Sequence, residues 1–140
     1  LNESLKWIER TSTKGSQSTK YLFGLYYFQN CDNKPENYTK AFTYLNEAYF
    51  DPELRYEEIV YAIGVCYEYG IGVNIDGDEA FNWYFGTSDN FFPQGHYDLG
   101  RCYEEGIGID YDIDEAKRYY EMAAQDGNID AQIRLKEYSE

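Results

Sequence analysis

The sequence predicts an all-α solenoid built from repeated helix pairs, and two observations support this fold class. Residues 58–84 recur at 94–120, with matching positions 36 apart. Within a copy, apolar residues return at helical spacing, as in Ile59, Ile63 and Cys66. A fixed period in this range is typical of a solenoid. The identical pairs are Gly64 and Gly100, Cys66 and Cys102, Tyr67 and Tyr103, Gly70 and Gly106, Gly72 and Gly108, Asp76 and Asp112, and Ala80 and Ala116.

Length and composition are those of one globular domain. The chain has 140 residues, of which 43% are hydrophobic, enough for a packed core. It begins at Leu1 and its only methionine is Met122, so we expect a piece of a longer protein. No apolar run approaches the roughly 18 residues that a membrane-spanning helix needs, so direct membrane insertion is not expected.

The first part of the chain is predicted to hold an incomplete repeat followed by a divergent one. A second helix of the incomplete repeat ends at Gly15, since glycine suits the position after a helix. The divergent repeat starts with a helix at 17–29. After a linker containing Pro35, we expect Asn37 to cap a helix at about 38–49.

The two regular repeats share one pattern of helix starts and stops. The first helix of the earlier copy is predicted at 57–69, with Gly70 ending it and Gly72 making the turn through a positive φ. Asp76 and Asp112 are each followed by glutamate three residues later, a variant of the capping box. The second helices are therefore predicted at about 77–88 and 113–125.

A last helix is predicted at 129–138. Lys136 takes the place of Gly100, and Arg134 and Glu137 are also charged. This helix either caps the solenoid with a polar outer face or marks the place where the chain was cut. The predicted organisation is one solenoid over 1–140, with a partial repeat at 2–15, a divergent repeat at 17–56, repeats at 57–92 and 93–128, and a terminal helix at 129–140.

The three cysteines do not suggest a disulfide framework. Cys31 has no close companion, and Cys66 and Cys102 fall in the same place of successive repeats. Stacked helices lie about 8–10 Å apart, beyond the ~7 Å that a disulfide spans between Cα atoms. We expect small buried hydrophobes and a cytoplasmic, reducing location, although a longer parent chain in the endoplasmic-reticulum lumen or outside the cell stays open.

Charge is unevenly distributed. The net charge is −14; residues 1–50 contribute +1 from six basic and five acidic residues, and residues 51–140 contribute −15 from six and 21. Nucleic acid is not an expected partner, because phosphate binding requires Lys and Arg on one face. The acidity either attracts a basic protein segment or keeps a repeat protein soluble.

The repeat pattern closely resembles the Sel-one-like repeat, a relative of the tetratricopeptide repeat. The resemblance is strong over 58–135 and looser over 2–50. The later copy carries it at Gly95, Leu99, Gly100, Tyr103, Gly106, Gly108, Ile109, Asp112, Ala116, Tyr119, Tyr120, Ala123, Ala124 and Gly127. The resemblance implies a right-handed superhelix of antiparallel helix pairs that serves as an adaptor or scaffold. The secreted, cysteine-rich branch of the family is disfavoured, because each late repeat has one cysteine.

In such solenoids the first helix of each pair lines the concave side. Three positions of that helix, each repeated in successive repeats, are therefore candidates for binding a partner. They share one helix face at i, i+4 and i+7. The predicted partner-binding groove consists of Tyr21, Leu25, Phe28, Tyr61, Val65, Glu68, Tyr97, Arg101 and Glu104. Tyrosine and arginine suit a peptide hot spot, and the glutamates would pair with basic residues. The alternative is that these tyrosines pack neighbouring helices together.

Catalytic and cofactor chemistry are not expected. His96 is the only histidine, and it lies two positions from Asp98, on another side of the helix from Asp98 and Cys102. The acidic run at 110–115 lacks the glycine and final glutamate of a calcium loop, and helix capping explains its acids. No cofactor or metal is therefore predicted.

Two functions from different classes remain. The first is a non-catalytic scaffold that binds a protein or peptide segment in the groove. The second is a structural module that self-associates through its solenoid ends, in which case a homodimer is expected.

Overall fold

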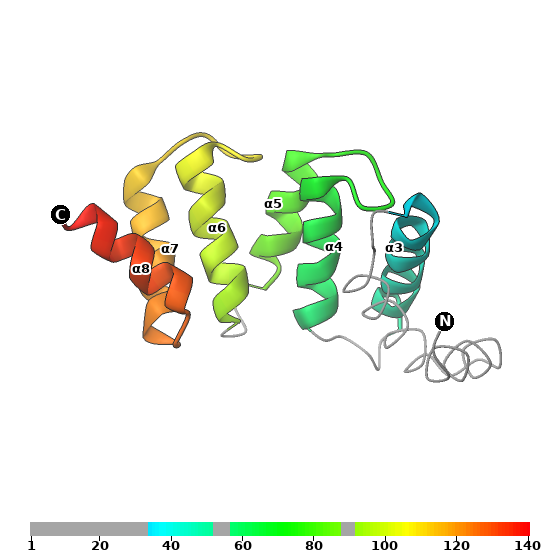
Figure 1. Cartoon of the computed structure of the whole chain (residues 1–140), viewed down its shortest axis with the longest axis horizontal. Coiled ribbons are helices and arrows are strands. Elements are labelled where there is room, and N and C mark those ends of the chain that lie inside the picture. The colour runs from blue at the N-terminus through cyan, green and yellow to red at the C-terminus, as the bar shows by residue number, and fades with distance from the viewer. Residues whose placement is uncertain (1–33, 52–56, 88–91) are drawn as a thin grey trace. The chain divides into compact units, whose positions relative to one another are not determined.

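In the computed structural model the described residues are 34–51, 57–87 and 92–140, and all their regular secondary structure is helical (Figure 1). Contacts divide the chain into two compact units, Leu1–Ile75 and Asp76–Glu140. The helices are α3 (Pro35–Tyr49), α4 (Glu57–Tyr69), α5 (Gly77–Phe85), α6 (Pro93–Glu105), α7 (Ile113–Gln125) and α8 (Ile129–Tyr138). None of the helices in these ranges is long and apolar enough to cross a membrane.

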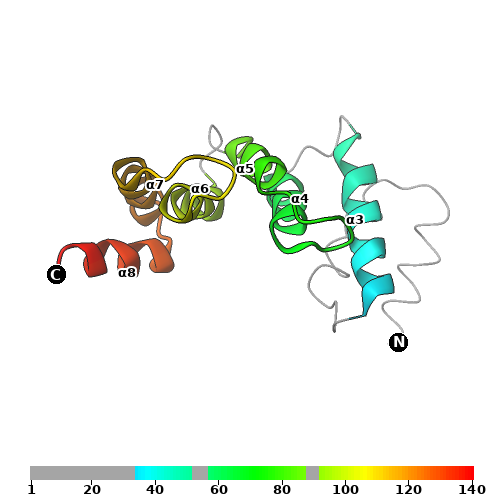
Figure 2. The ribbon, with the colours of Figure 1, turned by 90° about the horizontal axis from the view of Figure 1, so that it is seen from above.

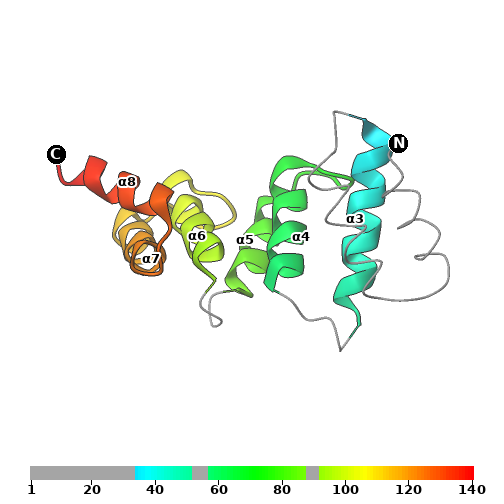
Figure 3. The same cartoon turned by 60° about the horizontal axis from the view of Figure 1, so that its bottom comes forward.

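In the first unit, α3 packs against α4 and the two run antiparallel (Figures 1 and 3). Ala41, Leu45 and Ala48 lie one helical turn apart on α3 and are fully buried. Ile59 and Ile63 of α4 are fully buried as well. The i, i+4, i+7 spacing on α3 is what places these side chains on one apolar stripe.

The start of α3 corrects one prediction. The helix begins at Pro35 rather than at about residue 38, and Asn37 is not its cap. Proline lacks an N–H and has a φ already suited to a helix, so Pro35 occupies the first turn. Asn37 lies inside that turn, where its backbone N–H donates to the Lys34 carbonyl at 3.0 Å.

The predicted helix stops after α4 are confirmed by backbone geometry. Gly70 and Gly72 have φ of 72° and 74°. Gly72 also lies so close to α3 that an added Cβ would stand 2.4 Å from the Tyr38 carbonyl oxygen. Next to this contact, the rings of Phe42 and Tyr67 meet edge to face at 5.7 Å. Glycine is thus required here for both its φ and its lack of a side chain.

The second unit repeats this junction between α5 and α6. A Cβ on Gly108 would stand 2.1 Å from the carbonyl oxygen of Gly77, and Gly108 has a φ of 68°. The rings of Phe81 and Tyr103 meet at 5.7 Å with an interplanar angle of 86°, the same values as in the first unit. The sequence repeat therefore corresponds to a repeated packing contact.

Helices α6 and α7 run antiparallel side by side, and α8 packs against α7 (Figures 1 and 2). The core at this end is built around Tyr120. Tyr120 is fully buried, together with the small residues Ala116, Ala123 and Ala131. Small side chains on α7 and α8 allow the two helices to approach closely while the large tyrosine fills the space beside them.

Side-chain caps fix the helix starts of the second unit. The Asp76 carboxylate accepts from the Glu79 amide at 3.1 Å, as predicted. The Asp112 carboxylate accepts from the amides of Asp114 and Glu115, each at 3.1 Å. The glutamate side chains take other partners along their own helices, since Glu79 accepts from the Trp83 indole at 3.2 Å. Each aspartate therefore provides the capping contact of a capping box.

Helix α5 is shorter than predicted, ending at Phe85 instead of about residue 88. Gly86 closes the helix with its N–H on the carbonyls of the last turn. The Thr87 hydroxyl then donates to the Tyr84 carbonyl at 2.7 Å, satisfying an acceptor that a longer helix would have used. Thr87 is buried against Gly95 of α6, where an added Cβ would clash with its hydroxyl at 1.8 Å.

The predicted burial of the repeated cysteines is confirmed. Cys66 and Cys102 are both fully buried and form no disulfide. Cys31 lies outside the described residues. The two cysteines act as small core residues of α4 and α6.

Candidate partner-binding groove

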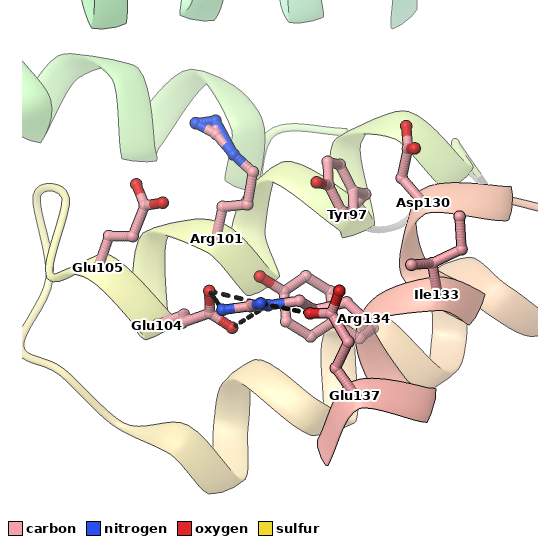
Figure 4. A pocket seen from close by; sticks show the side chains of 9 residues that line it. Tyr97, Arg101, Glu104, Glu105, Asp130, Ile133, Arg134 and Glu137 are labelled. Atoms are coloured by element: carbon pink, nitrogen blue, oxygen red, sulfur yellow. Dashed lines mark hydrogen bonds and ion pairs between the residues drawn. The ribbon is translucent and has the colours of Figure 1, made fainter. Parts of the chain in front are cut away.

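A pocket of about 400 Å³ opens between α6 and α8 (Figure 4). Four of its residues come from α6, four from α8, and one from α7. The lining residues are Tyr97, Arg101, Glu104 and Glu105 from α6, Tyr120 from α7, and Asp130, Ile133, Arg134 and Glu137 from α8. Tyr97, Arg101 and Glu104 stand at i, i+4 and i+7, so the pitch of α6 places them along one wall.

An ion pair joins the two walls. The Arg134 guanidinium donates from Nε to Oε2 of Glu104 at 2.9 Å and from Nη2 to Oε1 at 2.5 Å. It also donates from Nη1 to Glu137 at 2.6 Å. The planar guanidinium matches the carboxylate with two parallel bonds, the strongest form of this contact. Arg134 therefore fixes α8 against α6.

Tyr138 completes this network. Its hydroxyl donates to Oε2 of Glu104, and its ring lies 5.2 Å from the Arg134 guanidinium carbon. The Lys117 ammonium also lies near this ring, 5.1 Å from its centroid. Such contacts between cations and aromatic faces add about 0.5–1 kcal/mol each at exposed sites.

The network shifts the pKa of its members in the directions that its charges require. Burial opposes ionisation of Glu104, but the hydrogen bonds from Arg134 and Tyr138 outweigh it and hold the pKa of this carboxyl below its ordinary value. Burial and the hydrogen bond to Glu104 raise the pKa of Tyr138 to about 12. The pKa of Arg134 is raised by its bonds to Glu104 and Glu137.

Tyrosine rings form the floor. The rings of Tyr97 and Tyr120 lie 5.6 Å apart with a tilt of 40°. Tyr120 is seated against Gly100, where any Cβ would stand 2.6 Å from the ring. Burial raises the pKa of Tyr97, and the negative charges of Asp130 and Asp98 act in the same direction. The positive charges of Arg101 and Arg134 act in the opposite direction without outweighing burial, so Tyr97 is a neutral, half-buried aromatic surface among charges of both signs.

A second network of polar contacts connects α6 with the start of α8. The Asp98 carboxylate accepts from Gln94 at 3.2 Å and from Arg101 at 3.3 Å. The Gln94 amide oxygen in turn accepts from Asn128 at 3.4 Å, and the Asn128 side chain caps α8 through the Ala131 amide. This network of polar contacts orients the Arg101 side chain, which is only 15% exposed.

The structure distributes the predicted groove residues over three places. Tyr97, Arg101 and Glu104 line the pocket together. Tyr61, Val65 and Glu68 lie on α4 in the first unit and are partly exposed. Tyr21, Leu25 and Phe28 lie outside the described residues. One continuous groove through all nine positions stays a prediction.

The predicted groove did not include α8, although the repeat period aligns Ile133 with Tyr97 and Glu137 with Arg101, and one further signal pointed to this wall. Asp98 and Arg101 form an ion pair, and the residues 36 positions later are Arg134 and Glu137, which form the same pair with reversed charge. The reversal places a cation where the preceding repeat has an acid. The cation at this position, Arg134, contacts Glu104 of α6. The repeat period alone does not indicate this contact.

The residues that the sequence analysis weighed as catalytic or calcium-binding candidates make structural contacts. The His96 ring packs beside Tyr119 at 6.2 Å, and Cys102 is buried in the core. In the 110–115 segment, Asp112 caps α7 and Glu115 pairs with Arg118 at 2.7 Å. Within the described ranges no group of three or more His, Cys, Asp or Glu side chains is placed to hold a metal ion.

These features define a helical-repeat scaffold of the tetratricopeptide type, with a repeated packing junction and an aromatic, charged groove. The chain belongs to the Sel1 repeat family, whose sequence profile matches residues 21–49, 60–85 and 93–128. A comparison with curated proteins finds no match. Proteins of this family are generally non-catalytic and typically bind other proteins.

Solved structures that are similar to this chain include the following two. The crystal structure of a Sel1 repeat protein from Oxalobacter formigenes has 32% identity and a TM-score of 0.71, and the match covers 97% of this chain and 99% of that one. Cysteine rich protein B of Helicobacter pylori has 22% identity and a TM-score of 0.57, over 84% and 95% of the two chains. The second likeness concerns the fold alone. The all-α solenoid predicted from the sequence is confirmed.

Proposed function

We propose that this chain is a non-catalytic scaffold that holds a segment of another protein in the groove between α6 and α8. The observation that carries the proposal is the pocket itself, where a half-buried Tyr97 and an exposed Ile133 stand among charged side chains. A large, rigid aromatic surface with polar groups at its edge is the composition of a binding hot spot.

The groove is built to keep its shape. Arg134 and Tyr138 connect its two walls through Glu104, and Tyr120 is fixed beneath Tyr97 by close packing on Gly100. A pre-formed surface loses little conformational freedom when a partner binds, so more of the contact energy appears as affinity. This rigidity supports recognition of a segment by the groove.

Site-specific photo-crosslinking in the source cells tests this proposal. A photoreactive phenylalanine analogue at Ile133 samples the groove, and the same analogue at Tyr111, which is 65% exposed and outside the pocket, is the matched control. We expect a protein crosslinked from position 133 only, with a yield that falls at least tenfold in a Tyr97→Ala background. Equal crosslinking from both positions, or none from position 133, contradicts the proposal.

Self-association through the end of the solenoid is a second candidate. Ile129 and Ile133 are one turn apart on α8 and are 68% and 53% exposed. Exposed apolar residues on a terminal helix favour pairing with another copy. Sedimentation equilibrium distinguishes the two functions: self-association predicts a mass that rises with concentration and returns to the monomer value when both isoleucines are changed to serine.

A further inference from the structure

We propose that the groove recognises a basic, apolar-flanked peptide segment, with a lysine or arginine side chain lying on Tyr97 beside Asp130. The inference rests on the proposed function and specifies the chemistry of the partner. It is drawn from the charges that the groove leaves exposed, from its apolar wall, and from the distribution of charge over the second unit.

The second unit is strongly acidic. Residues 76–140 contain 16 Asp and Glu against five Lys and Arg, which gives −11 of the net −14. A field of one sign attracts segments of the opposite sign and raises their rate of association. Nucleic acid and acidic peptides are repelled by the same field.

Both arginines of the pocket form ion pairs with acidic residues of the same unit, whereas some acids of the pocket remain exposed and unpaired among the described residues. Arg134 is engaged by Glu104 and Glu137, and Arg101 is engaged by Asp98. Glu105 and Asp130 also line the pocket and are exposed, and neither forms an ion pair within the described part of the chain. The groups of the pocket that remain for a ligand are therefore mainly negative.

These two acids, Glu105 and Asp130, stand at opposite ends of the groove. Figure 4 shows Asp130 beside Tyr97 and Ile133 at one end and Glu105 at the other. The end with Asp130 combines an aromatic surface, an apolar side chain and a carboxylate. Lysine and arginine carry an apolar stem and a cationic head, so one side chain can cover Ile133, lie on the Tyr97 ring and reach Asp130.

Fluorescence anisotropy with designed peptides tests the inference. The probe is a labelled ten-residue peptide of alternating lysine and leucine, and its relatives replace every lysine by glutamate or every leucine by serine. We expect the lysine–leucine peptide to bind, the glutamate peptide not to bind, and the serine peptide to bind at least tenfold more weakly. Binding should weaken with added salt, because surface charge pairs are screened.

A matched pair of variants locates the binding. Asp130→Asn removes one negative charge in the groove, and Glu121→Gln removes one from an exposed position of α7 outside it. We expect Asp130→Asn to weaken binding about fivefold, corresponding to one exposed charge pair, and Glu121→Gln to change it less than twofold. Circular dichroism confirms that both variants keep their helix content.

The outcomes separate the inference from the proposed function. Equal effects of the two variants, or equal binding of the glutamate peptide, overturn the basic specificity. If position 133 still crosslinks a partner in cells, the groove function stands and only its charge preference fails. If crosslinking fails as well, both fail. A change in the sedimentation mass with Asp130→Asn, without a change in peptide binding, identifies a second copy as the occupant and also overturns the inference.

Discussion

Gly100 and Tyr120 are in direct contact, with the tyrosine ring occupying the space where any other residue at 100 would carry its Cβ. Tyr120 is fully buried and its ring supports Tyr97 in the groove. The absence of a side chain at Gly100 of α6 thus leaves the space that the buried Tyr120 ring of α7 fills.

Gly100→Ala should destabilise the protein by about 1–3 kcal/mol, because its Cβ would stand 2.6 Å from the ring and force the core to repack. Urea denaturation measures the change. Combining it with Tyr120→Leu should recover part of the loss, since the smaller side chain leaves room. If the double variant loses the sum of the two single losses, the steric explanation is wrong.

Gly108→Ala should cost more than Gly127→Ala. Both glycines have positive φ, but Gly127 has nothing within 4 Å of an added Cβ, whereas Gly108 would meet the Gly77 carbonyl oxygen at 2.1 Å. We expect about 1 kcal/mol for Gly127→Ala from backbone strain and about 3 kcal/mol or more for Gly108→Ala. Thermal unfolding of the two variants side by side tests this order, and equal losses would contradict it.

Asp112→Ala should destabilise the protein by about 1 kcal/mol, since the carboxylate accepts from two backbone amides at the start of α7. Asp112→Asn keeps the capping oxygen and should lose much less. The comparison is made by urea denaturation at neutral pH. If asparagine is as damaging as alanine, the charge and not the cap is what matters.

Acid should weaken the contact between α6 and α8. The pKa of Glu104 is lower in the folded protein than its ordinary value of 4.5, so its ionised form stabilises the fold at higher pH. This contribution is present above about pH 4.5 and is lost as the pH falls through the folded pKa. Glu104→Gln should flatten the acid side of the stability profile relative to the wild type. An unchanged slope in this variant would exclude Glu104 as the cause.

High pH should destabilise the folded protein through ionisation of the Tyr138 hydroxyl. Its pKa is raised from 10.0 to about 12, so the neutral hydroxyl is favoured in the folded state. The stabilisation is complete below pH 10 and is lost as the pH rises toward 12. The pKa values of Tyr97, Tyr103 and Tyr120 are raised as well, so ultraviolet absorbance of tyrosinate should show several late-titrating groups, and Tyr138→Phe should remove one of them. If the amplitude of the late phase is unchanged in the variant, Tyr138 is not one of these groups.

The sequence determined the local features because each depends on residues close together in the chain. A positive φ requires glycine, as at Gly70 and Gly72. An aspartate caps the amides two or three residues after it, as Asp112 does. The errors were also local: Pro35 started α3 before Asn37, and the Thr87 hydroxyl took the carbonyl that a longer α5 would have used.

Only the tertiary structure decided what faces the groove from α8. Arg134 and Glu104 are 30 residues apart, and Tyr138 and Glu104 are 34 apart, whereas the repeat period is 36. These pairs fall outside the period because they depend on how closely α8 approaches α7, which the small Ala123 and Ala131 permit. Packing distance is a property of two surfaces together, so the sequence pattern of either helix does not contain it.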